Sequence, residues 1–148
     1  MKVVVQRSKK SSVSVDGKLV NSIESGLCLL VGVHVDDTFE DADKLVNKVL
    51  NLRIFDDEEG IMNKSILDVG GEILSISQFT LQADTRKGHR PSYINAMKGE
   101  EAIVLYNKFN ELLKDNDIHV ETGIFGAEMD VHIRNDGPVT IIIDSKVR

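Results

Sequence analysis

The run Leu27 to Val33 constrains the fold of this chain more than any other stretch. It is apolar at every position except Gly32. A continuous apolar run of this length is typical of a strand that is covered on both faces. With 148 residues, 41% hydrophobic content and 28% charged content, the sequence indicates one soluble domain, residues 1–148, that can bury a core around such a strand.

Periodic patterns predict the other elements. The pair Asp16-Gly17 is a strong hairpin signal, and it predicts that a strand from Val3 to Val15 pairs with one from Lys18 to Ile23. Two apolar stripes at helical spacing and several short apolar runs follow. They predict, in order, a helix after the caps Asp36–Thr38, strands Arg53–Phe55 and Glu72–Leu81, a helix Gly99–Asn116, and strands Ile118–Thr122, Glu128–Ile133 and Val139–Ile143. This order, two strands, strand and helix twice, then three strands, indicates a single α/β domain that is substantially antiparallel.

Charge and cysteine content limit the classes of function. The net charge of -6 argues against broad electrostatic binding of nucleic acid, which depends on neutralising phosphates. A local basic loop from Arg86 to Arg90 can still serve a small phosphate footprint, or can be a solvated loop. The single cysteine, Cys28, lies in the apolar run and suggests a reducing compartment. Without a signal peptide or membrane-spanning run, the expected location is cytoplasmic.

The strand Glu72–Leu81 ends in the polar string Ser77-Gln78-Phe79-Thr80-Leu81. A hydroxyl, an amide, an aromatic ring and a second hydroxyl are crowded together where a buried strand emerges. Such an end fits either a core strand with polar residues at its exit or a functional site. A second string, Asn135-Asp136-Gly137-Pro138-Val139-Thr140, leads into three isoleucines.

Together the two strings resemble the signature motifs of the D-aminoacyl-tRNA deacylases, the D-Tyr-tRNA deacylase family, from Met1 nearly to Asp144. The resemblance implies a three-layer β/β/α roll that forms a homodimer. It also implies a hydrolase without cofactor that cleaves the ester bond of D-aminoacyl-tRNA and of glycine mischarged on tRNA-Ala. The sequence departs from common family residues at Tyr93, Glu128 and Met97-Lys98, which puts the detail of the RNA contacts in doubt.

The resemblance gives Ser77, Gln78, Phe79 and Thr80 the catalytic role. An aminoacyl ester is already activated, so a positioned water and donors for the oxyanion can suffice. The resemblance places the backbone of Phe79 and Thr80 against the reacting carbonyl and lets the ribose 2'-hydroxyl assist the water. Thr80 is either a positioning residue or a covalent nucleophile, although no base stands at a recognisable spacing.

The step Gly137-Pro138 is the expected chiral selector. A bond before proline can be cis at modest cost, and a cis bond points two successive carbonyls to one side, where they could grip an α-ammonium group. The side chain of one enantiomer would then point outward and that of the other would strike the backbone, whereas glycine would not be excluded. The resemblance implies that the L-amino acid is the one rejected. The resemblance adds that this step enters the active site of the other subunit. The alternative is an ordinary turn with a trans proline.

Other residues are candidates for contact with the tRNA. Phe125 and Met129 suit stacking on the terminal adenine, with core packing as the competing interpretation. Further candidates for substrate or phosphate contact are Arg7, Arg86, Lys87 and Asn135. Scattered histidines and an acidic turn without ligand spacing favour no metal. Competing hypotheses are a non-catalytic dimeric module that binds RNA or a small ligand, and a small-molecule hydrolase or deaminase.

Overall fold

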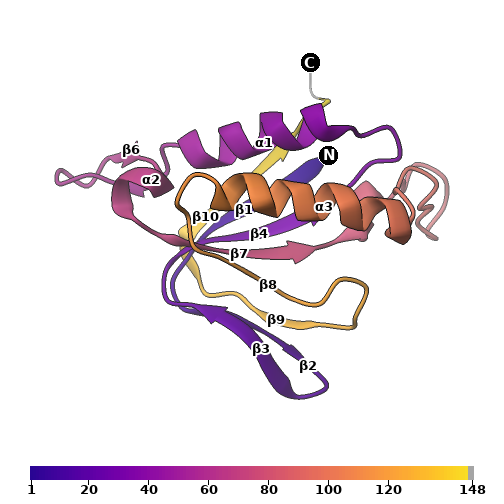
Figure 1. Ribbon diagram of the computed structural model, residues 1–148, viewed down its shortest axis with the longest axis horizontal. Coiled ribbons are helices and arrows are strands. Elements are labelled where there is room, and N and C mark those ends of the chain that lie inside the picture. Colours follow the sequence, from indigo (N-terminus) through magenta and orange to yellow (C-terminus); the bar gives the residue numbers. More distant parts are fainter. Residues whose placement is uncertain (147–148) are drawn as a thin grey trace.

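The protein consists of two main β-sheets, a small two-stranded sheet and a layer of helices (Figure 1), as seen in a computed structural model that describes residues 1–146. The larger sheet has five strands in the order β10-β1-β4-β7-β8. These strands are β10 (Asn135–Asp144), β1 (Lys2–Ser8), β4 (Gly26–Gly32), β7 (Glu72–Ser77) and β8 (Val120–Thr122). β1 pairs antiparallel with both β10 and β4, whereas β4–β7 and β7–β8 are parallel. This sheet is therefore mixed, and less antiparallel than expected from the order of elements.

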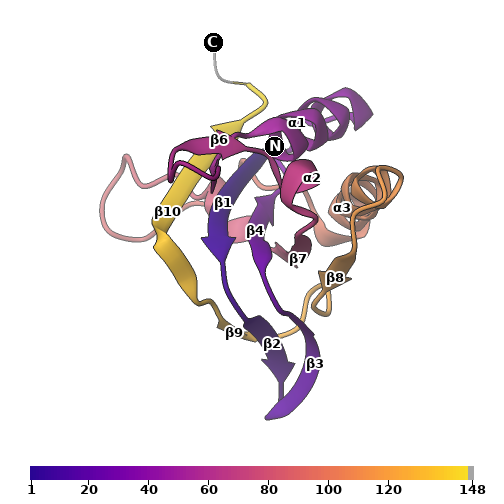
Figure 2. The same cartoon turned by 90° about the vertical axis from the view of Figure 1, so that its left-hand side faces the viewer.

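Two long helices cover one face of the five-stranded sheet (Figures 1 and 2). They are α1 (Phe39–Asn51) and α3 (Gly99–Lys114), and they pack against each other as well as against the sheet. The main core lies between helices and sheet, with fully buried side chains such as Phe109 from α3 and Leu29 from β4. The strand expected over Leu27 to Val33 is thus confirmed as β4, which has the helices on one side.

The other face of β4 and β7 carries the second sheet, which has three antiparallel strands in the order β3-β2-β9. The strands are β2 (Ser11–Val15), β3 (Lys18–Ile23) and β9 (Asp130–His132). A smaller core fills the space between the sheets, from residues Val13, Ile23, Cys28, Leu74 and Ile76. Burial raises the pKa of the Cys28 thiol to about 12. The coverage of β4 on both faces follows from its continuous apolar sequence.

Capping residues account for where α1 begins. The Asp41 carboxylate accepts a hydrogen bond of 2.8 Å from the Thr38 N–H, which completes a capping box. Burial would raise the pKa of Asp41, but the Thr38 N–H, the Ser145 hydroxyl and the Lys146 ammonium outweigh it and lower the pKa to about 2. The C-terminal segment is thereby tied to the first turn of α1.

Several expected boundaries were wrong. The strand expected from Val3 to Val15 breaks at Lys9, whose N–H donates to the Arg134 carbonyl, because its two halves belong to different sheets. The short strand expected at Arg53–Phe55 lies one step later, as β5 (Phe55–Asp56) with β6 (Met62–Lys64). The remaining differences are the end of β7 at Ser77, the end of α3 at Lys114, the short strands β8 and β9, the early start of β10 and a four-residue helix α2 (Ile66–Val69).

The predicted hairpin is confirmed. β2 and β3 meet at Asp16 and Gly17, which have φ angles of 51° and 77°. A two-residue turn with both φ angles positive matches the twist of the strands that it joins. No helix within residues 1–146 combines the length and the apolar character needed to span a membrane.

Candidate active site

A cavity of about 470 Å³ opens where β4 and β7 end, between the two sheets and the start of α3. Its wall is mainly apolar, and Tyr106 is the only titratable side chain among the described residues that line it. The lining comprises Val31, Val33, Ile76, Ser77, Gln78, Phe79, Met97, Gly99, Ala102, Tyr106, Phe125, Gly126, Ala127, Met129 and Val131. The cavity therefore suits a flat apolar group, and acid–base chemistry has little protein support within it.

The motif Ser77–Leu81 does not continue as a strand. After β7 the chain turns into a 3-10 helix, η1 (Phe79–Gln82). The Gln78 N–H still donates to the Val31 carbonyl at 2.8 Å, and the Gln82 side-chain amide then donates to the Gly32 carbonyl at 2.9 Å. The turn is thus held against the end of β4.

Gly32 allows this close approach. A Cβ atom at position 32 would lie 2.8 Å from the Leu81 Cβ and 2.9 Å from the Gln78 carbonyl oxygen. Any larger residue would push the turn away from β4. The glycine that interrupts the apolar run therefore has a steric role at the rim of the cavity.

The turn presents backbone donors at its start. Within η1 the Leu81 N–H donates to the Gln78 carbonyl at 3.2 Å, and the Ala83 N–H to the Thr80 carbonyl at 3.1 Å. The N–H groups of Phe79 and Thr80 precede these bonds, and the leading N–H groups of a helix have no partner inside it. Two adjacent donors at the edge of an apolar cavity can hold a developing oxyanion.

The side chains of the motif have distinct positions. The Gln78 side-chain amide donates to the Thr80 hydroxyl oxygen, so this hydroxyl already accepts from a neutral amide. The Phe79 ring is 58% exposed and meets the Tyr93 ring edge-on, with 5.1 Å between centroids. The contact of the Thr80 hydroxyl is with a neutral amide and not with a general base, which nucleophilic attack would need.

The deeper wall of the cavity is aromatic and sulfur-containing. Phe125 and Met129, both candidates from the sequence, line the cavity together with Tyr106. The rings of Tyr106 and Phe125 lie 5.7 Å apart, and the Tyr106 hydroxyl donates to the Ser75 carbonyl at 2.7 Å. Burial raises the pKa of Tyr106. Tyr106 lies within the predicted helix Gly99–Asn116 as one of its regularly spaced apolar residues, and this pattern held no signal of a role in the cavity.

The second motif lies at the other end of the five-stranded sheet. Gly137 and Pro138, joined by a cis peptide bond, lie on β10 next to Arg7 of β1. The 78–82 turn lies at the opposite end of β1, where the Lys2 ammonium donates to the Leu81 carbonyl. Lys2 and Arg7 are five residue steps apart along the extended strand, which is roughly 17 Å. Within one chain the two motifs therefore do not meet.

Arg7 and Asn135 fix the second motif. The Arg7 guanidinium donates to the carbonyls of Asp136 at 3.0 Å and Ile54 at 2.9 Å. The Asn135 side-chain oxygen accepts from the Val139 N–H at 2.9 Å, across the Gly137-Pro138 step. Within one chain, Arg7 and Asn135 both lie beside the Gly137-Pro138 peptide, and neither lines the cavity.

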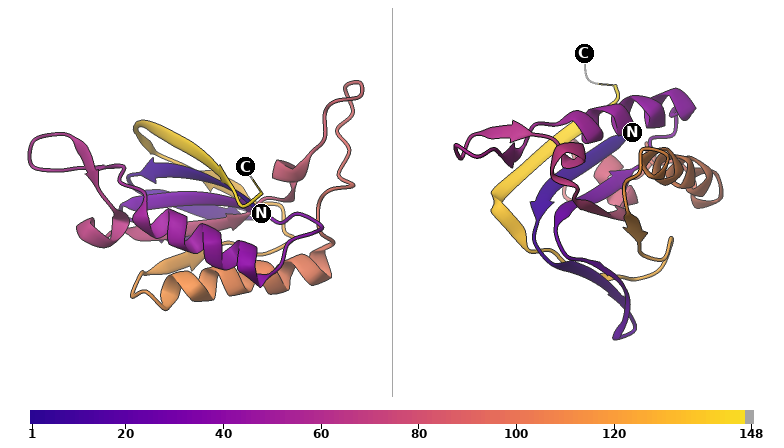
Figure 3. Two further views of the ribbon diagram at one scale, coloured as in Figure 1. Left: turned by 90° about the horizontal axis from the view of Figure 1, so that it is seen from above. Right: turned by 60° about the vertical axis from the view of Figure 1, so that its left-hand side comes forward.

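The basic loop extends away from the body of the molecule (Figure 3). Arg86 forms an exposed ion pair of 2.8 Å with Asp84, and Lys87 is exposed beside it. The cavity and this loop are thus separate surfaces. Across residues 1–146, no three histidine, cysteine, aspartate or glutamate side chains gather into a group that could hold a metal ion.

The fold and the site together define a class: single α/β domains with an apolar cavity whose polar rim is backbone. The chain belongs to the family described as D-Tyr-tRNA(Tyr) deacylase, whose model matches residues 4–144. It is 56% identical over 146 residues to a D-aminoacyl-tRNA deacylase from Bacillus velezensis, covering 99% of each chain. It is 58% identical to one from Bacillus cytotoxicus, covering 99% of this chain and 100% of that one.

A solved structure of similar shape is that of the c-Myc DNA Unwinding Element Binding Protein. Its TM-score is 0.94 at 44% sequence identity, and the match covers 99% of this chain and 100% of that one. The relatives thus match this chain over essentially its whole length. The family expected from the two sequence motifs is confirmed.

Proposed function

We propose that this chain is a D-aminoacyl-tRNA deacylase, an enzyme that hydrolyses the ester bond between a D-amino acid and the terminal ribose of its tRNA. The observation that carries the proposal is the pair of leading N–H groups of η1, on Phe79, which lines the apolar cavity, and on the adjacent Thr80. Membership of the deacylase family gives this arrangement its substrate class.

The reaction needs little from protein side chains. Water adds to the ester carbonyl, and the N–H groups of Phe79 and Thr80 hold the oxyanion. The bond from the carbonyl carbon to the ribose oxygen then breaks, and the proton of the water passes to that oxygen. The neighbouring ribose 2'-hydroxyl assists the attacking water. This assistance is consistent with a cavity in which Tyr106 is the only described titratable side chain of the wall.

The terminal adenine occupies the apolar cavity. Its faces contact Phe125 and Met129, since aromatic rings and polarizable sulfur suit the faces of bases. Ser77 and Gln78 shape the polar rim, and the exposed Phe79 ring, supported by Tyr93, borders the amino acid. Arg86 and Lys87 lie on the extended loop, where they can reach backbone phosphates further along the tRNA.

Chiral selection requires a second copy of the chain. Gly137 and Pro138 are exposed and lie beside Arg7, roughly 17 Å along β1 from the end at which Lys2 contacts the 78–82 turn, so they border a cavity only in a partner subunit. β10 is an edge strand, and its outward-facing Ile142 is 65% exposed. An exposed apolar edge strand favours association with another chain. In the proposed homodimer, the carbonyls of this step bind the α-ammonium group and close the direction that an L side chain would need.

The same geometry predicts that glycine is not rejected, because glycine has no side chain to exclude. The enzyme therefore also hydrolyses glycyl-tRNA, including glycine mischarged on tRNA-Ala. These activities belong in the cytoplasm, where aminoacyl-tRNAs are used.

One assay tests the proposed reaction. The protein is mixed with D-Tyr-tRNA, L-Tyr-tRNA and the free methyl ester of D-tyrosine, with and without a chelator, and loss of each ester is followed. We expect rapid loss of the D-Tyr-tRNA ester alone, unchanged by the chelator or by a DNA duplex added as competitor. Tight binding of all tRNAs without hydrolysis would instead indicate a non-catalytic binding module, and cleavage of the methyl ester a small-molecule hydrolase.

A mixing experiment tests the cross-subunit arrangement. Gly137 has a φ of +132°, which a residue with a Cβ rarely adopts, and the new Cβ of Gly137→Ala would lie 2.9 Å from Val139 Cγ2, so this variant strains the step. Gly32→Ala displaces the turn at Gln78 instead. If each site combines both chains, mixed dimers of the two variants contain one site free of both changes. Activity that rises above either variant after subunit exchange is expected, and an unchanged sum of activities would refute the arrangement.

A further inference from the structure

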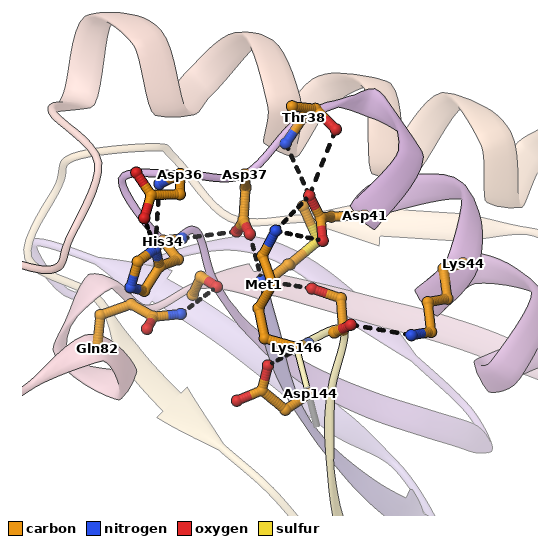
Figure 4. A network of polar contacts seen from close by, with 12 residues as sticks. Met1, His34, Asp36, Asp37, Thr38, Asp41, Lys44, Gln82, Asp144 and Lys146 are labelled. Atoms are coloured by element: carbon orange, nitrogen blue, oxygen red, sulfur yellow. Dashed lines mark hydrogen bonds and ion pairs between the residues drawn. The ribbon is translucent and has the colours of Figure 1, made fainter. Parts of the chain in front are cut away.

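The amino group of Met1 lies in the interior of the protein (Figure 4). It forms an ion pair of 2.6 Å with the Asp37 carboxylate, and both groups are 0% exposed. It also donates to the Ser145 hydroxyl at 2.8 Å, while the Ser145 N–H donates to the Met1 carbonyl at 2.9 Å. A fully buried ion pair is costly to form and is weak evidence for stability. Stability alone therefore does not account for this ion pair, and we ask which segments of the chain it holds in place.

The second oxygen of Asp37 connects this ion pair to the wall of the cavity. It accepts a hydrogen bond of 2.7 Å from the His34 N–H. The segment 33–35 in turn pairs with the segment 95–97, through Met97 N–H to the Val33 carbonyl at 3.1 Å and Val35 N–H to the Asn95 carbonyl at 2.8 Å. Val33 and Met97 both line the cavity. Asp37 thus holds one strand of a two-stranded element that forms part of the wall.

The same element ends at the rim. The Ala96 N–H donates to the Tyr93 carbonyl at 3.0 Å, which fixes the turn that carries the Tyr93 ring. This ring meets Phe79, whose backbone N–H is one of the two donors at the start of η1. A continuous series of contacts therefore runs from the amino group of Met1 to the rim of the cavity.

We propose that the ion pair between the Met1 amino group and Asp37 is a positioning element of the active site, which sets the 33–35 and 95–97 segments against the cavity. The pair needs a free α-ammonium group at Met1. A retained formyl group removes the charge, and one added residue moves the ammonium by about 3.8 Å.

The test compares the unaltered protein with Asp37→Asn, with a chain that carries one glycine before Met1, and with both changes together. Backbone hydrogen exchange is measured for residues 33–37 and 92–97, and kcat and KM for D-Tyr-tRNA. The control is Glu58→Gln, which makes the same change in an exposed ion pair with Lys64. We expect faster exchange in both segments and a loss of roughly tenfold or more in kcat/KM in the first three variants only.

Since one interaction is removed in two ways, the combined variant should lose little more than either single change. Unchanged exchange in residues 92–97, or additive losses, would overturn the inference. The kinetic part rests on the proposed function, whereas hydrogen exchange does not: an unaltered protein without deacylase activity refutes only the function. If Asp37→Asn fails to fold, the glycine-extended chain and Ser145→Ala, which removes one hydrogen bond of the amino group, provide the same comparison.

Discussion

Replacing Gly32 by alanine tests the proposed use of backbone donors most directly. Gly32 ends β4, and its backbone needs no left-handed conformation, so alanine is excluded only by its neighbours. The new Cβ would lie 2.8 Å from the Leu81 Cβ and 2.9 Å from the Gln78 carbonyl oxygen, whereas ordinary contacts begin at 3.4 Å. Because one of these neighbours is backbone, no side-chain rotation relieves the overlap, and the turn from Gln78 to Leu81 must shift.

The size of the shift sets the expected loss. Restoring ordinary contacts moves the turn by roughly half an ångström, and overpacking of this kind costs about 1–3 kcal/mol of folding stability. The donors of Phe79 and Thr80 move with the turn. Since a misplacement of about 1 Å can cost about a hundredfold in rate, we expect kcat to fall roughly tenfold. KM should change less, because Phe125 and Met129, which also line the cavity, do not belong to the displaced turn.

The assay is single-turnover hydrolysis of D-Tyr-tRNA, with unfolding by urea measured in parallel. Gly60→Ala is the matched control. Gly60 has a φ of +77° and no atom within 4 Å of its added Cβ, so alanine there costs about 1 kcal/mol through backbone strain without moving the site. Equal rates for Gly32→Ala and the unaltered protein, or equal losses in both variants, would refute the role of the turn.

Three further predictions concern single groups. Thr80→Ala removes one hydrogen bond and should lower kcat by less than about tenfold; near-total loss of hydrolysis in a folded variant would instead identify Thr80 as a nucleophile. The pKa of Asp41 is lowered from 3.8 to about 2 in the folded protein, so the stability it contributes is complete above pH 3.8 and is lost as the pH falls towards 2. The unfolding free energies of Asp41→Asn and the unaltered protein should accordingly converge in acid, and a constant difference would contradict this. Because burial raises the pKa of Cys28 to about 12, a thiol reagent at pH 8 should label it only after unfolding, and rapid labelling of the native protein would show that the thiol is accessible.

Local signals explain the parts of the fold that the sequence predicted well. The hairpin at Asp16-Gly17 and the start of α1 at Thr38 depend on residues next to one another in the chain. The break between β1 and β2 does not depend only on residues that are neighbours in the chain. Ser8 and Ser11 are buried polar residues that bond to each other and to nearby backbone as the chain crosses between sheets, and from the sequence alone they fit an alternating strand equally well. The helix α2 was missed although its capping pair, Ser65 and Asp68, is visible in the sequence.

The shape of the site depends on contacts between distant parts of the chain. Ser77 to Leu81 alternates as a strand would, yet it turns at Gln78 because Gly32 leaves room for it and the Gln82 amide reaches the Gly32 carbonyl, 50 residues away in the sequence. Alternation alone cannot predict this turn, since its cause lies on another strand. Strand register matters equally at the opposite end of the sheet: pairing of β1 with β10 sets Arg7, a candidate for substrate or phosphate contact, beside Gly137. A sequence motif therefore shows which residues are functional candidates. Strand pairing and register must be known before one can say which of those candidates lie next to each other.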